Sequence, residues 1–101
     1  MNGDKVPPVV TIKSPAADAK FTGLTAITFS GTASDKAGVT TVEYQTLFNG
    51  EITTETTATG TNAWTFSLTP SAAGPYTVYV KAVDANGNES ALVSRSITVS
   101  P

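Results

Sequence analysis

The sequence predicts an all-β sandwich, and three observations lead to that prediction. The chain has 101 residues, of which 40% are hydrophobic and 14% charged, a balance typical of one folded, soluble domain. It is rich in Thr, Val and aromatic residues, which favour strands over helices. Turn residues recur every eight to twelve positions, roughly, and short runs of β-forming residues lie between them.

The first two predicted strands are Val9–Lys13 and Thr25–Ala33. Pro7 and Pro8 precede the first strand. Their rings fix an extended backbone, and neither residue has a backbone N–H that could donate to a neighbouring strand. In the second strand every other residue is apolar or small, which predicts a core-facing side made of Ile27, Phe29, Gly31 and Ala33.

The next two strands form a predicted hairpin. Val39–Phe48 turns Val42 and Tyr44 towards the core, and the Asn49-Gly50 pair that follows is a strong hairpin signal. Glu51–Thr59 continues as a Thr-rich, weakly apolar segment. We therefore expect it at the edge of a sheet.

The last three strands show the clearest alternation of apolar and polar residues. The fifth predicted strand is marked by apolar residues at every second position, Trp64, Phe66 and Leu68. The sixth and seventh predicted strands are Tyr76–Val83 and Leu92–Val99. Arg95 falls on the core-facing side of the seventh strand, which predicts a bulge or an exposed strand end. We expect one core containing Trp64, Phe29, Tyr44, Phe66, Val78 and Val80.

Several segments resemble those of one protein family. Gly74-Pro75-Tyr76-Thr77-Val78, followed by Ala82-Val83-Asp84-Ala85-Asn86-Gly87-Asn88, resembles the penultimate strand and turn of bacterial immunoglobulin-like (Big-type) repeats. Gly31-Thr32-Ala33-Ser34-Asp35, Gly38-Val39 and the Trp64 strand continue the resemblance in order. It implies a seven-stranded antiparallel Greek-key immunoglobulin-like β-sandwich, in which Tyr76 can close the corner before its strand. Residues 1–8 are then a linker, and residues 9–101 form one domain.

The composition excludes several kinds of function. The chain has no Cys and no His, so it lacks a thiol nucleophile, the commonest general base and the commonest metal ligand. Nothing marks the pair of carboxylates that a glycosidase needs, and we expect no enzymatic activity. The six Lys and Arg are scattered and the net charge is -2, which argues against nucleic acid as a partner. No apolar run is long enough for membrane insertion.

Asp35, Asp84 and Asn86 form a candidate metal site. The turns that carry them lie at the same end of an immunoglobulin-like sandwich, and Asn88 and Asp4 belong to the same end. Their oxygens suit calcium. Tight turns also favour Asp, Asn and Gly, through side-chain bonds to nearby amides, so turn chemistry is the alternative to calcium. We expect no other cofactor.

The resemblance and the absence of chemistry together predict a non-catalytic extracellular module. It would be a structural spacer or adhesin-stalk repeat of a bacterial surface protein, monomeric, with neighbouring domains of the same chain as its partners. Further partners could be a host or cell-surface protein or glycan. The alternative is an accessory binding module of the fibronectin type III kind, which binds a carbohydrate or protein and is attached to a secreted enzyme.

Overall fold

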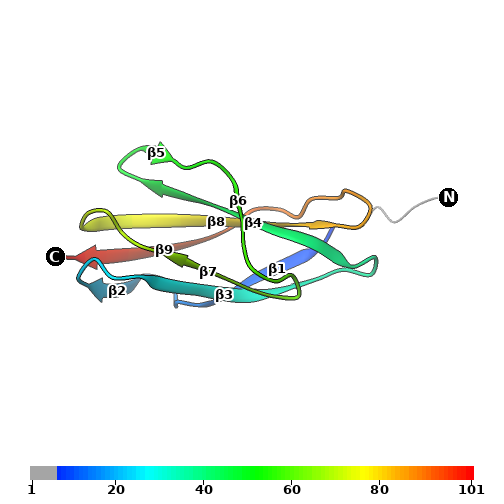
Figure 1. The fold of residues 1–101 in the computed structure, drawn as a ribbon, viewed down its shortest axis with the longest axis horizontal. Helices are drawn as coiled ribbons and strands as arrows, with labels where there is room; N and C mark the ends of the chain where they lie inside the picture. The colour runs from blue at the N-terminus through cyan, green and yellow to red at the C-terminus, as the bar shows by residue number, and fades with distance from the viewer. Residues whose placement is uncertain (1–6) are drawn as a thin grey trace.

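The computed structural model describes residues 7–101, which form nine strands in two facing sheets (Figure 1). The described residues contain no helix that could cross a membrane. The smaller sheet has the order β1-β3-β7, and the larger has the order β2-β9-β8-β4-β5, with β6 also paired to β4. The strands are β1 Val9–Ser14, β2 Ala19–Thr22, β3 Ile27–Ser34, β4 Val39–Phe48, β5 Glu51–Ile52, β6 Thr56–Thr57, β7 Ala63–Leu68, β8 Gly74–Asp84 and β9 Val93–Ser100.

The predicted fold class is confirmed, but the strand count and the purely antiparallel pairing are wrong. The expected edge strand Glu51–Thr59 is divided into β5 and β6. The strand β2 was missed, because its four residues include only one large apolar side chain, Phe21. It pairs with β9 in parallel, from Ala19 opposite Ile97 to Thr22 opposite Ser100. The chain thus changes sheets between β1 and β2.

The core lies between the sheets and follows the predicted alternation. Trp64, Phe29, Phe66, Val78 and Val80 are buried, as expected. Tyr44 is only half-buried, which corrects its placement in the core. Its ring stacks on Phe66, with the centroids 3.6 Å apart, but β7 is the last strand of the smaller sheet and covers only one side of it.

Gly31 is the residue against which Trp64 packs. These two residues are paired across β3 and β7, and the indole Nε1 donates to the Thr32 carbonyl oxygen at 3.1 Å. A Cβ atom at position 31 would collide with the indole ring and with the backbone carbonyl of Thr11 on β1. The absence of a side chain here therefore allows the large ring to lie between three strands.

Arg95 neither forms a bulge nor marks an exposed strand end. The pairing of β8 with β9 is regular, with Arg95 opposite Val78, and the side chain is half-buried. Its guanidinium donates to the carbonyl oxygen of Ile12 on β1 at 2.8 Å. An arginine on the inner face is tolerated here because its charged end reaches the opposite sheet at the edge of the core.

We predict that Gly31→Ala lowers the free energy of unfolding by about 3 kcal/mol, because the new methyl group overpacks the site between β1 and Trp64. Chemical denaturation followed by Trp64 fluorescence measures the change. The matched control is Thr32→Ala on the exposed face of the same strand, which should cost at most about 1 kcal/mol. Equal stability of the Gly31→Ala protein and the unmodified protein would contradict this packing.

Candidate functional site

Polar groups gather at the end of the sandwich where β1 begins, which we call the linker end. The β3–β4 and β8–β9 turns meet there, since Val39 pairs with Asp84 and the backbone N–H of Ala85 donates to the Gly38 carbonyl at 2.9 Å. The sequence-based expectation that the turns bearing Asp35 and Asp84 lie together therefore agrees with the observed geometry.

Asp84 is buried at the end of β8, where its carboxylate organises the following turn. Its Oδ1 accepts hydrogen bonds from the backbone N–H groups of Asn86 at 2.9 Å and Asn88 at 2.8 Å. Its Oδ2 accepts a bond from the Asn88 side-chain amide at 2.9 Å. This is the arrangement that turn chemistry predicts, in which an Asp side chain satisfies the amides of its own turn.

Asp35 lies beside Asp84, in the turn between β3 and β4. The Asp35 side chain favours the ionised form of Asp84 and lowers its pKa. Asp35 therefore contributes to holding Asp84 in its ionised form.

The pKa of Asp84 lies below its ordinary value. Burial alone would raise it, but hydrogen bonds from the Asn88 side chain and backbone, the neighbouring Asp35 side chain and a hydrogen bond from the Asn86 backbone outweigh burial. The folded protein thus stabilises the ionised form of a buried carboxyl group. This makes Asp84 a structural anion of the turn.

The candidate calcium ligands are only partly gathered in one place. Asn86 is exposed and contributes its backbone N–H to Asp84, whereas Asp4 lies outside the described residues. No group of three or more acidic side chains that could hold a metal occurs within residues 7–101. A calcium ion would have to displace the N–H groups that donate to Asp84, and calcium binding stays a prediction.

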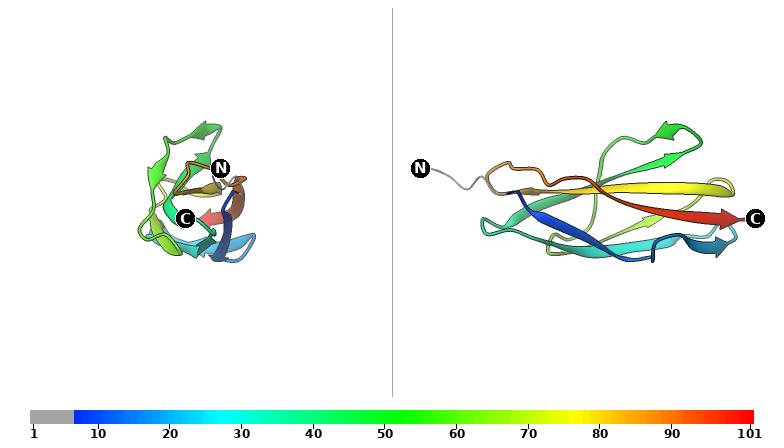
Figure 2. Two further views of the ribbon diagram at one scale, coloured as in Figure 1. Left: turned by 90° about the vertical axis from the view of Figure 1, so that its right-hand side faces the viewer. Right: turned by 180° about the vertical axis from the view of Figure 1, so that it is seen from behind.

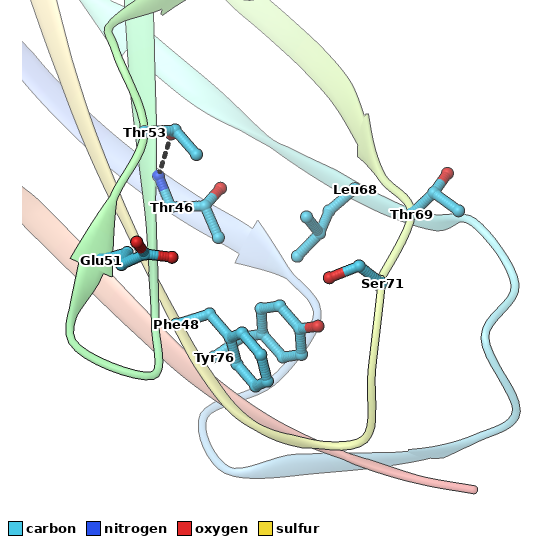
Figure 3. Close-up of a pocket in the computed structure, with 8 residues that line it drawn as sticks. All are labelled: Thr46, Phe48, Glu51, Thr53, Leu68, Thr69, Ser71 and Tyr76. Atoms are coloured by element: carbon cyan, nitrogen blue, oxygen red, sulfur yellow. Dashed lines mark hydrogen bonds between the residues drawn. The ribbon is translucent and has the colours of Figure 1, made fainter.

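A second candidate site is a groove of about 260 Å³ between the two sheets (Figure 3). It opens on the side where the β4–β5 hairpin faces the end of β7. At its base the rings of Phe48 and Tyr76 stack with centroids 4.2 Å apart. Its lining residues are Thr46, Phe48, Glu51, Thr53, Leu68, Thr69, Ser71 and Tyr76.

Tyr76 has the structural role predicted for it. Its hydroxyl donates to the carbonyl oxygen of Ala72 at 2.8 Å and accepts from the N–H of the same residue at 3.2 Å. These two bonds close the corner before β8. The tyrosine is buried and forms the floor of the groove.

Thr46 creates the polar wall of the groove. It occupies an inward position of β4, between Tyr44 and Phe48, and is buried. Its backbone N–H donates to the Thr53 hydroxyl at 2.9 Å. Sequence reasoning missed the groove, although a threonine among inward-facing aromatic residues was the signal that could have indicated it.

Three glutamates surround Lys81 on the outer face of the larger sheet. Its ammonium lies 2.8 Å from Glu55, 3.0 Å from Glu89 and 3.9 Å from Glu43. Hydrogen bonds to Glu55 and Glu89 raise the pKa of Lys81 above its ordinary value. These carboxylates are held by a permanent cation, so they do not resemble the acid and nucleophile pair of a glycosidase.

These sheets and their pairing define an immunoglobulin-like β-sandwich. The chain belongs to the bacterial Ig domain family, whose model matches residues 8–80. A search among curated protein sequences finds no significant match.

Solved structures share the fold at low sequence identity. The chain is similar to the fibronectin(III)-like modules of Clostridium thermocellum CbhA, with a TM-score of 0.71, 19% identity, and coverage of 91% of this chain and 97% of that one. It is similar to the PKD1 domain of Vibrio anguillarum Epp, with a TM-score of 0.59, 20% identity, and coverage of 96% and 98%. It is also similar to the SrpA adhesin of Streptococcus sanguinis, with a TM-score of 0.65, 17% identity, and coverage of 96% of this chain and 59% of the adhesin chain.

We predict that the domain loses stability as the pH falls below about 4, the ordinary carboxyl range, because the pKa of Asp84 is lower in the folded than in the unfolded state. The ionised Asp84 carboxylate stabilises the folded domain at pH values above its pKa in the unfolded state. This stabilisation is lost as the pH falls through the pKa of Asp84 in the folded state. Asp84→Asn should be less stable at pH 7 and should vary less with pH. Urea denaturation between pH 7 and pH 2 measures both effects, and Asp18→Asn in an exposed turn is the control. A pH dependence in Asp84→Asn equal to that of the unmodified protein would refute the assignment.

Calcium binding and turn chemistry predict different melting temperatures. A site at Asp35 and Asp84 predicts a higher melting temperature in 10 mM calcium than in EDTA, with a gain of about 1.4 kcal/mol at tenfold excess over Kd. Turn chemistry alone predicts no difference. The shift should disappear in Asp35→Asn and in Asp84→Asn, because each change removes a carboxylate ligand. No shift in the unmodified protein would rule out the calcium site.

Proposed function

We propose that the domain is a load-bearing spacer, a non-catalytic stalk repeat of an extracellular bacterial surface protein. The positions of the two chain ends carry this proposal. β1 starts at Val9 opposite Ser34 at the linker end, whereas β9 ends next to Gly74 at the far end (Figure 2). The sandwich is elongated, with extents of 54 × 23 × 19 Å. Neighbouring domains would therefore be joined in line along its long axis.

The pairing of β2 with β9 supports a role in resisting extension. Both strands run from the linker end to the far end, since they pair in parallel. Tension on the two chain ends pulls β2 and β9 in opposite directions along the same ladder. Two further backbone hydrogen bonds, each 2.8 Å long, lie at the two ends of this ladder. The N–H of Asp18 donates to the Ser96 carbonyl, and the N–H of Gly23 donates to the Ser100 carbonyl. All bonds of the ladder are then loaded together in shear, rather than one after another.

The remaining chemistry supports a non-catalytic role. The chain has neither His nor Cys, and its clustered glutamates are held by Lys81. The family and the similar fibronectin(III)-like and adhesin structures agree with a module of a larger extracellular protein. The groove beside β7 supports a second role, in which the domain also binds a ligand.

We predict that the domain resists force more strongly when pulled through its two ends than when pulled from the N-terminus and residue 85. The second geometry attaches both handles at the linker end and does not shear β2 against β9. The chain has no cysteine, so Ala85→Cys provides a unique handle in an exposed turn. Single-molecule force spectroscopy on this variant measures both geometries.

The same Ala85→Cys protein pulled through its ends controls for any change in stability. Equal unfolding forces in the two geometries would contradict the role of the β2–β9 pair. They would also remove the main support for the load-bearing spacer.

A further inference from the structure

We propose that the open edge of β7 binds an extended peptide segment as an added strand, with one side chain of the segment inserted into the groove. The partner is a segment of another protein with an apolar residue for the groove and a Lys or Arg beside it. This binding role is independent of the spacer function.

The backbone of Ser67 provides the first part of the site. Thr65, two residues earlier, exchanges two backbone hydrogen bonds with Thr59, each 2.8 Å long. In an antiparallel ladder the direction of these bonds alternates from residue to residue. The N–H and C=O of Ser67 therefore point to the same side as those of Thr65, away from β3.

This edge continues beyond the short contact with Thr59. β7 is the last strand of the smaller sheet, and within residues 7–101 no strand or bridge pairs with Ser67 on its outer side. Ser67 and Thr69 are both exposed. The N–H of Ser67 can donate a hydrogen bond to the backbone of another extended segment, and its C=O can accept one from it. Such pairing is the basis of binding by strand addition.

The groove provides the second part of the site. A strand added to β7 would lie in the plane of the smaller sheet, and every other side chain would point between the sheets. That space is the groove, where Leu68 on β7 faces Thr46 and Phe48 on β4 (Figure 3). Its volume of about 260 Å³ leaves room for an inward-pointing apolar side chain.

Glu51 indicates the charge of the partner. Its side chain is exposed and lines the groove, opposite the end of β7. No Lys or Arg of the described residues forms an ion pair with it. A carboxylate at the mouth of a partly apolar groove favours a segment that places a cationic side chain next to its apolar residue.

The probe is a soluble ten-residue peptide of alternating valine and threonine with one central lysine. A second peptide carries glutamate in place of lysine, and a third is N-methylated at every backbone amide. NMR titration of the isotopically labelled chain should show saturable shifts of the Ser67, Thr69 and Thr46 amides with the lysine peptide. The glutamate peptide should bind more weakly, and the N-methylated peptide should not bind, because it has no N–H to donate to the Ser67 carbonyl and its methyl groups obstruct strand pairing.

Two variants distinguish the contribution of the Ser67 backbone groups from that of the Ser67 side chain. Ser67→Pro removes the outward N–H but no bond to β3, and proline is tolerated where a strand N–H faces solvent. It should weaken binding about tenfold, the effect expected from losing one hydrogen bond and the geometry around it. Ser67→Ala keeps both backbone groups and should bind as the unmodified protein does. Glu51→Gln should weaken only the binding of the lysine peptide.

Two results would overturn the proposal. One is the absence of any saturable shift with the lysine peptide at millimolar concentration. The other is binding that persists unchanged in a folded Ser67→Pro protein, which would place the peptide elsewhere. If Ser67→Pro does not fold, equal binding of the N-methylated and unmodified peptides to the original chain would overturn the proposal instead.

Discussion

The indole of Trp64 is the contact on which the arrangement of both sheets depends. It fits between β1, β3 and β7 because Gly31 has no side chain, and its ring lies 5.9 Å from that of Phe66. Phe66 in turn stacks on Phe29 within its own sheet and on Tyr44 in the other. These stacked aromatic rings hold the smaller sheet against β4. The two sheets lie farther apart beyond the last ring. The groove begins just beyond Tyr44, where the next inward residue of β4 is a threonine.

Local alternation of residues was sufficient to predict most strands, because each long strand buries one face. β3 and β8 fulfil that condition, and their inward residues were identified correctly, whereas on β4 Tyr44 is only half-buried and the buried Thr46 was not expected. β2 could not be found in this way, since its position depends on the sheet change after β1 and on pairing with β9, nearly eighty residues away. Arg95 illustrates the same limit: its partner, the Ile12 carbonyl, comes from the opposite end of the chain.

The candidate sites differ in how far the sequence could reveal them. The proximity of Asp35 and Asp84 follows from the order of strands in this fold, so it could be expected from the sequence. The hydrogen bonds that saturate Asp84 depend on the backbone path through Asn86 and Asn88, which composition does not specify. The groove requires three separate segments to meet, and the open edge at Ser67 is apparent only once β7 is known to be the last strand of its sheet.

The bond between Arg95 and Ile12 makes the two long sides of the sandwich unequal. On that side the sheets are joined by the continuous chain from β1 to β2 and by the guanidinium contact. On the opposite side, residues 56–59 connect β4 to Thr65 of β7, but beyond Thr65 the end of β7 and the β4–β5 hairpin face each other across the groove with no strand between them in the described residues. Thermal fluctuations that separate the sheets should therefore act as a rotation about the Arg95 side. This motion would widen the groove before it separates the sheets on the Arg95 side. Amide hydrogens near Leu68 would therefore exchange with solvent sooner than those near Ile97.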